Sequence, residues 1–459
     1  MKANKPYRTA PVPSSSVPGG IPYIVGNEAA ERFSYYGMRT ILTIFMTKYL
    51  MDRTGQPDLM SDAEAKENYH LFSTAAYLTP IAGAFLADVF IGKYRTILWL
   101  SGFYCLGHAA LALDETRTGL AIGLGLIAIG AGGIKPCVSA HVGDQFGPSS
   151  QHHLPGVFRW FYFSINLGAF ASSLLTPLLL KRYGPGVAFG IPGALMFLAT
   201  IVFWCGRHQF IHIPPGGKRF LREVASKEGL TTALRLGVLY VFIAPFWALF
   251  DQTGSAWVLQ AEKMDLQFLG VEWLPSQVQA INPILVLVLI PIFSKLVYPA
   301  LGRFFRLTPL RVIGIGLFLT TIAQVFPAWV EELIQRGETP NVGWHVCAYF
   351  VLTSAEVMVS ITGLEYSYTQ APKTMKSVVM ALWFASVSLG NYVTSLVNAW
   401  IGADKDASRL EGASYFWFFA VVMLVTAILF VIFALFFKEK TYIHKEAAEA
   451  GTSAPPDGE

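Results

Sequence analysis

The chain has 459 residues, of which 53% are hydrophobic and only 14% are charged. Soluble domains carry nearer a quarter charged residues, so this composition excludes an ordinary soluble protein and predicts an all-α polytopic membrane protein. The net charge of +4 says little about partners, because the position of the charges matters more than their sum, and no nucleic-acid partner is predicted. The four cysteines lie within apolar segments without metal-ligand spacing, so neither a metal site nor a cofactor is expected.

Apolar runs of about 20 residues or more predict twelve transmembrane helices. Residues 1–20 are polar and rich in Pro and Ser, with no cleavage signature, so the first helix is expected to act as an uncleaved insertion signal. The predicted spans are 21–50, 69–91, 94–113, 118–141, 158–182, 186–206, 232–259, 277–301, 308–330, 344–369, 376–402 and 413–437.

Basic residues outside these spans collect in the loops on the side of the amino end, while acids such as Asp58 and Glu331 dominate the opposite loops. The positive-inside rule therefore predicts that both termini are cytoplasmic. The basic loop 207–231 divides the chain into six-helix halves, 21–206 and 232–437, and contains a possible interfacial helix at 218–228. Residues 438–459 are expected to form a solvated cytoplasmic tail.

The first predicted helix carries four ionisable side chains within about three turns. Each costs roughly 2.5–3.5 kcal/mol in lipid, so such groups face a wet cavity or one another. Spacings of three and four residues place them on one stripe with two tyrosines. The residues are Glu28, Glu31, Arg32, Tyr35, Tyr36 and Arg39. This cluster can carry protons and bind a zwitterion, and the alternative is an ion-pair cluster that only holds helices together.

The loop between the second and third spans has the pattern Gly83…Asp88…Gly92-Lys93-Tyr94-Arg95. It resembles the loop signature of the major facilitator superfamily, which places two six-helix bundles around a midplane site. Asp88 can cap the neighbouring helix and pair with Lys93 or Arg95 as a latch on one face. A plain turn at Gly92 with solvated cations is the alternative, although it leaves a buried Asp88 unexplained. A weak echo, Pro291…Lys295…Gly302-Arg303…Arg306, lies at the equivalent place of the second half.

Seven charged residues lie deep in the predicted spans, and their signs nearly balance. They are Glu28, Glu31, Asp251 and Glu356 against Arg32, Arg39 and Lys135. Such a balance predicts ion pairs whose partners can be exchanged, as a proton-driven gate requires. Lys135 stands before Pro136 and after closely spaced glycines, which predicts a bend and close helix packing. It is either a fixed partner of Glu28 or Glu31, or a ligand for a substrate carboxylate, and we favour the second role superposed on the first.

Six stretches together resemble the signatures of the proton-dependent oligopeptide transporter (POT) family. The similarity spans nearly the whole chain, but the extra helix pair that many bacterial members carry between the halves is not present here. The stretches are Glu28-x-x-Glu31-Arg32-Phe33-x-Tyr35-Tyr36-Gly37, Gly132-Gly133-Ile134-Lys135-Pro136…Gly143-Asp144-Gln145-Phe146, Phe161-Tyr162-Phe163-Ser164-Ile165-Asn166-Leu167-Gly168, Phe246-Trp247-Ala248-Leu249-Phe250-Asp251-Gln252, Ala280-Ile281-Asn282-Pro283 and Thr353-Ser354-Ala355-Glu356-Val357.

The resemblance implies roles for individual residues. The peptide pocket would be lined by Arg32, Tyr35, Arg39, Tyr77, Lys135, Asn166, Trp247, Asn282, Glu356, Trp383 and Phe384. Lys135 and Arg32 would face the peptide carboxylate, and Glu356 with the asparagines its amino end. Proton coupling would involve Glu28, Glu31, Arg32, His70 and Asp251. Arg39 would pair with Asp251 in an outer gate, at a position where many relatives carry Glu.

His70 leaves two interpretations open. It stands as in the animal peptide transporters, where this histidine joins proton coupling, but a lone histidine at a helix start is more often a surface residue. The implied function is proton-coupled symport of di- and tripeptides into the cell by a monomer in the cell membrane, with peptides, protons and lipid as partners. Alternatives are a carrier of nitrate, amino acids or drugs, or a subunit of a redox-driven proton pump. No hydrolase motif appears in the spans, so an enzyme is not expected.

Overall fold

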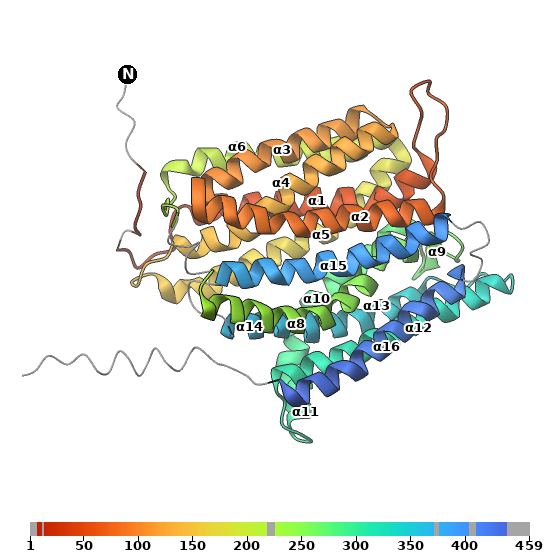
Figure 1. Cartoon of the computed structure of the whole chain (residues 1–459). Helices are drawn as coiled ribbons and strands as arrows, with labels where there is room; N and C mark the ends of the chain where they lie inside the picture. Colours follow the sequence, from red (N-terminus) through yellow and green to blue (C-terminus); the bar gives the residue numbers. More distant parts are fainter. Residues whose placement is uncertain (1–6, 12, 218–224, 371–375, 404–409, 438–459) are drawn as a thin grey trace, which may run out of the picture.

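The structure is a computed structural model that describes residues 7–11, 13–217, 225–370, 376–403 and 410–437. Twelve long helical segments run side by side and make up almost all of it (Figure 1). Those of the first half are α1 (Ile21–Lys48), α2 (Asp62–Phe85, continued by a π-helical turn Leu86–Ile91), α3 (Lys93–Leu113), α4 (Arg117–Asp144), α5 (Leu154–Tyr183) and α6 (Pro185–Cys205). Those of the second half are α8 (Lys227–Phe250) with α9 (Ala256–Ala261), α10 (Ile281–Ile292) with α11 (Tyr298–Gly302), α12 (Pro309–Gln335), α13 (Gly343–Glu356) with α14 (Thr362–Thr369), α15 (Lys376–Ala403) and α16 (Ala413–Phe436).

Eleven of these segments in the described residues are long and apolar enough to cross a membrane. The twelfth is α1, whose middle holds the charged stripe predicted from the sequence. The predicted all-α polytopic fold is therefore confirmed. One feature was not predicted: a two-stranded antiparallel hairpin, β1 (Gln267–Phe268) and β2 (Val271–Glu272), follows α9. Its turn residues Leu269 and Gly270 have φ of 52° and 76°.

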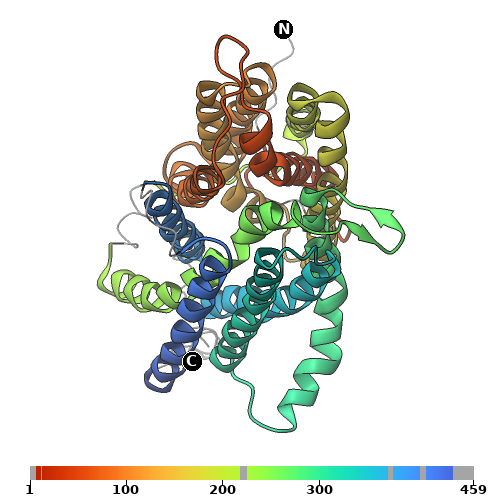
Figure 2. The same cartoon turned by 90° about the vertical axis from the view of Figure 1, so that its right-hand side faces the viewer.

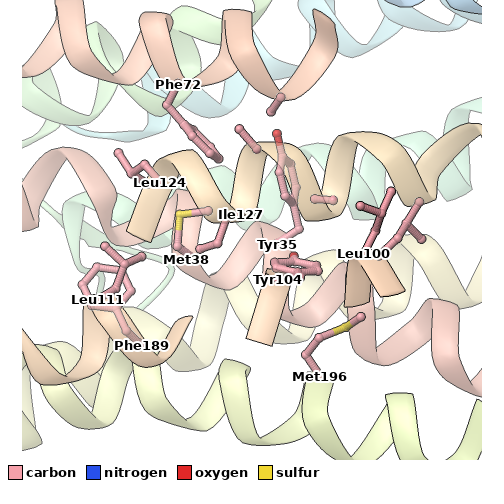
Figure 3. Close-up of a cluster of buried hydrophobic side chains, with 14 of the residues drawn as sticks. Tyr35, Met38, Phe72, Leu100, Tyr104, Leu111, Leu124, Ile127, Phe189 and Met196 are labelled. Carbon is pink, nitrogen blue, oxygen red and sulfur yellow. The ribbon is translucent and has the colours of Figure 1, made fainter. Parts of the chain in front are cut away.

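The two halves of the chain lie against each other, with α15 of the second half beside α2 of the first (Figures 1 and 2). One buried apolar cluster draws on residues 21–210, and two others draw on residues 236–430. Side chains from α1, α2, α3, α4 and α6 interdigitate in the first cluster (Figure 3). These separate cores fit the predicted division at 207–231, which stays a prediction. Most of the predicted helix 218–228 lies outside the described residues, and α8 begins at Lys227 after the N-cap Ser226.

Helices α2 and α4 pack with their backbones in contact. A Cβ built on Gly83 would lie 2.4 Å from the Cα of Gly133, so position 83 has no room for a side chain. The Thr79 hydroxyl of α2 donates to the Ala128 carbonyl of α4 at 2.7 Å. This close approach matches the packing expected from the glycines around Lys135. It also fixes which side chains of α2 lie next to that lysine.

The predicted latch at Asp88 has different partners in the structure. Lys93 pairs with Asp144 at the end of α4, with Nζ 2.8 Å from Oδ2. Arg95 is exposed, and Asp88 is half-buried in the π-helical turn, where its backbone carbonyl accepts from the Gly216 N–H at 2.7 Å. Within the described part of the chain, no cation lies within 4 Å of the Asp88 carboxylate. Lys93 therefore pairs with an acid of α4 in this conformation, and the role of Asp88 as a latch stays a prediction.

Candidate functional site

Three charged residues of the α1 stripe, Glu28, Glu31 and Arg32, form one compact cluster. Arg32 Nε lies 2.7 Å from Glu28 Oε1 and 3.3 Å from Glu31 Oε2, so one guanidinium serves two carboxylates. Both carboxylates are buried, with side-chain exposures of 2% and 1%. Neither Glu31 oxygen has a hydrogen-bond partner among the described residues. The cluster therefore holds one more acid than base, and the Glu31 carboxylate can still accept hydrogen bonds.

Lys135 lies close to this cluster but pairs with neither carboxylate. Its Nζ sits 3.8 Å from the ring centre of Tyr35 and 4.2 Å from that of Tyr77. In the described residues the buried ammonium has no hydrogen-bond partner. A fixed ion pair with Glu28 or Glu31, one of the two roles considered for this lysine, is not formed in this conformation.

The second half contributes a carboxylate of its own. Glu356, at the end of α13, accepts from the Asn282 amide at 2.7 Å, and the same amide donates to Thr353 Oγ1 at 3.1 Å. Tyr36 on α1 is within electrostatic reach of both Arg32 and Glu356. Asn166 on α5 is buried, and its amide donates to the Tyr162 carbonyl at 2.9 Å. Acidic and basic groups of opposite halves thus approach a common region.

Aromatic side chains predicted for the pocket contact one another within and between the halves. Trp247 and Trp383 meet edge to face with ring centres 6.3 Å apart, and Tyr77 meets Phe384 of the other half at 6.2 Å. The buried indole N–H of Trp247 has no partner among the described side chains. Charges that can fix the ends of a ligand, with aromatic walls between them, suit a ligand whose ends are constant and whose side chains vary.

A hydrogen-bonded chain crosses between the halves at the end toward which α1 runs, here called the far side. Arg39 of α1 pairs with Asp251 Oδ1, and Asn391 of α15 donates to Asp251 Oδ2 at 2.6 Å. His70 Nδ1 lies 2.7 Å from Asn391 Oδ1, and His70 Nε2 lies 2.9 Å from Ser255 Oγ. Because the Asn391 amide nitrogen faces Asp251, its oxygen faces His70, so Nδ1 must donate.

This chain tests two predictions. The expected pair between Arg39 and Asp251 is formed, while its role as a gate stays a prediction. His70 is fully buried between the halves, so its interpretation as a surface residue is wrong. Asn391 and Ser255 were missed from the sequence. A buried amide in a transmembrane segment requires a partner, so Asn391 within the apolar run 376–402 was the available signal.

Further bonds join the halves on the same side. Thr43 Oγ1 donates to the Gly254 carbonyl at 2.7 Å, and Gln279 donates to the Thr40 carbonyl at 3.1 Å. Lys48 at the end of α1 pairs with Glu262 just after α9. The described bonds between the halves therefore close the far side, above the central charges.

The chain resembles one family of known proteins over most of its length. A sequence model of the POT family, PTR2, matches residues 94–232 and 219–418. The chain is 36% identical over 384 residues to solute carrier family 15 member 2 of Danio rerio, covering 72% of this chain and 52% of that protein. It is 35% identical over 375 residues to peptide transporter family 1 of Drosophila melanogaster, covering 71% and 49%. The chain thus spans about half the length of these curated relatives.

Solved structures give the same result. The crystal structure of an auto-inhibited POT family peptide transporter matches with a TM-score of 0.83 at 36% identity, covering 93% of this chain and 99% of that one. The POT family transporter PepTSo matches with a TM-score of 0.83 at 36% identity, covering 91% and 98%. Unlike the animal relatives, these structures are covered almost completely.

Proposed function

We propose that this chain, which belongs to the POT family of transporters, is a proton-coupled symporter of di- and tripeptides. The observation that carries the proposal is the free Lys135 ammonium on the first half, set against the Glu356 carboxylate on the second. A short peptide of any sequence offers a carboxylate, an amine and a backbone as its constant features. Lys135 binds the first, Glu356 binds the second, and the aromatic walls accept variable side chains.

Proton coupling is assigned to the acid cluster of α1. Two carboxylates share the single Arg32 guanidinium, and Lys135 is within electrostatic reach of Glu31. A proton on Glu31 leaves the shorter bridge between Arg32 and Glu28 in place. Glu31 is therefore the acid that exchanges its proton, and Glu28 is the fixed partner of Arg32.

The transporter works by alternating access in the cell membrane, with both termini in the cytoplasm. In this orientation the far side is the outer side. The bonds around Arg39 and Asp251 close it, so the conformation is one in which the outer gate is shut. The monomer holds all residues of the proposed site.

The test is uptake of dialanine into proteoliposomes under an imposed inward proton gradient. Accumulation should require the gradient, disappear with a protonophore and resist competition by nitrate or free alanine. Glu31→Gln should abolish accumulation but retain counterflow exchange of dialanine. Glu365→Gln is the matched control, because Glu365 is exposed in the first turn of α14. Accumulation that survives collapse of the gradient would overturn the proposal, and normal accumulation by the Glu31 variant would remove Glu31 from the proton path.

A further inference from the structure

We propose that Tyr35 and Tyr77 are positioning residues that hold the Lys135 ammonium between their ring faces and keep it free for an incoming carboxylate. The inference rests on the proposed function only for the identity of that carboxylate, the C-terminus of a small peptide. It assigns to Tyr77 a role through Lys135, distinct from direct contact with the ligand.

Two observations carry it. The distances of 3.8 Å and 4.2 Å from Nζ to the two ring centres lie well inside the range of about 6 Å for a cation–π contact. The rings are the partners that the structure gives this ammonium, since the described residues place no carboxylate within 4 Å of Nζ and no hydrogen-bond acceptor next to it. A buried ammonium without compensation is costly, and the two rings supply the direct contacts that offset part of this cost.

The neighbouring acids are held elsewhere. Arg32 occupies both Glu28 and Glu31, at 2.7 Å and 3.3 Å. Lys135 therefore balances the remaining negative charge of the cluster from a distance, without forming an ion pair with either acid. A ring holds a cation less strongly than a carboxylate does and leaves its N–H donors unused. A lysine kept between rings can therefore bind a ligand's carboxylate without first breaking an ion pair.

Packing of α2 on α4 fixes the second ring. Gly83 meets the Gly133 backbone, and a Cβ on Gly132 would meet Thr79. These contacts lie within two turns of both Tyr77 and Lys135. The tight packing of α2 on α4 therefore fixes the position of the Tyr77 ring relative to the Lys135 ammonium. The ring of Tyr77 also meets Phe384 of the second half at 6.2 Å. Tyr35 is fully buried in the core of the first half (Figure 3), so its substitution would perturb folding, and Tyr77, which is half-buried, is the residue to test.

The binding test compares dialanine with dialanine amide, which lacks the terminal carboxylate, on the purified full chain. A desolvated cation–π contact of about 2 kcal/mol corresponds to roughly 30-fold. Tyr77→Leu should therefore reduce the preference for dialanine over the amide by about 10- to 30-fold, whereas Tyr77→Phe, which keeps the ring, should stay within about twofold of wild type. In a Lys135→Gln background, Tyr77→Leu should change the preference by less than about twofold, since the cation is gone. Equal losses for Phe and Leu, or an undiminished effect without Lys135, would overturn the proposal.

A second measurement needs no ligand. Acetic anhydride labels unprotonated amines, and mass spectrometry can compare Lys135 with the exposed Lys48 as an internal standard. Tyr77→Leu should raise the relative labelling of Lys135 by about fivefold or more, because the ring no longer holds the charged ammonium, and Tyr77→Phe should not. Unchanged labelling of Lys135 in the Tyr77→Leu variant would overturn the proposal that the two rings hold its ammonium. If wild type fails to distinguish dialanine from its amide while the labelling result holds, the proposed function is at fault and not the positioning role.

Discussion

Replacing Asp251 by Asn removes the negative charge from the buried pair that closes the far side. The side chains of Arg39 and Asp251 are 8% and 3% exposed. Removing one partner of such a pair costs about 3–5 kcal/mol, because the other charge stays buried without compensation. The two carboxylate oxygens of Asp251 also serve different donors, Arg39 and Asn391. An Asn side chain has one oxygen, so one donor would lose its acceptor.

The expected effect is a shift between conformations and not a loss of folding. At about 1.4 kcal/mol per factor of ten, the ratio of far-side-open to far-side-closed molecules should rise by about two to three and a half orders of magnitude. The bonds from Thr43 to the Gly254 carbonyl and from Gln279 to the Thr40 carbonyl remain in the variant. These two hydrogen bonds join uncharged groups, so they oppose opening of the far side less strongly than the buried ion pair does.

A second ion pair across the same interface provides the control. Lys48 and Glu262 are 52% and 20% exposed. A solvent-exposed pair contributes about 0–1 kcal/mol, so Lys48→Gln should change the same ratio by about fivefold at most. The two variants differ in the burial of the pair they break, and burial is the quantity under test.

The assay is pulsed electron spin resonance with nitroxide labels at Gln56 and Glu338, with the native cysteines replaced. Both positions are exposed in far-side loops, one on each half. Asp251→Asn should add a population at longer label separation, and Lys48→Gln should resemble the parent. The reasoning is refuted if the Asp251 variant keeps the parent distribution, or if the exposed pair has the larger effect.

Three further variants test other parts of the structure. Gly83→Ala should lower the melting temperature markedly, because its Cβ would meet the Gly133 backbone at 2.4 Å, whereas Gly125→Ala on α4, with open space around it, should not. Glu356→Gln should reduce the preference for dialanine over its N-acetyl form by roughly 10- to 100-fold, since it removes a charged acceptor worth about 1.5–3 kcal/mol. Hydrogen bonds from the Gln267 N–H and the Asn341 amide lower the pKa of Asp265 below its usual value. Its stabilisation of the hairpin is therefore present at neutral pH and lost below about pH 4, which hydrogen exchange of residues 265–272 can follow against Asp265→Asn.

The sequence was sufficient to predict the parts of the site that lie on one helix or that depend on deep charge. Glu28, Glu31 and Arg32 are spaced by three and four residues, so a helix alone brings them together. The partnership of Arg39 and Asp251 across the halves was implied by the family resemblance, and the structure forms it despite the shorter acid. Both predictions used residues whose burial in lipid demands an explanation.

The parts that could not be predicted depend on where one helix sits along another. Lys93 pairs with Asp144 at the end of α4, a partner that no spacing in the sequence marks. The burial of His70 depends on α15 packing against α2, and the contact of Lys135 with two rings depends on the depth at which α2 meets the glycines of α4. Such registers follow from the shape of whole helix surfaces, so a motif search does not give them.

The charges of the central site offer a reason for proton and peptide to travel together. Glu28 and Glu31 face Arg32 and Lys135, so the four groups are neutral as a set when all are ionised. A peptide carboxylate that takes Lys135 leaves two acids opposite one guanidinium, and a single proton on Glu31 restores neutrality. In the proposed site the peptide's amine binds Glu356 on the other half, so a loaded site would also connect the two halves. The far-side bonds are then no longer the main link between the halves, and a loaded, protonated carrier can exchange them for bonds on the opposite side.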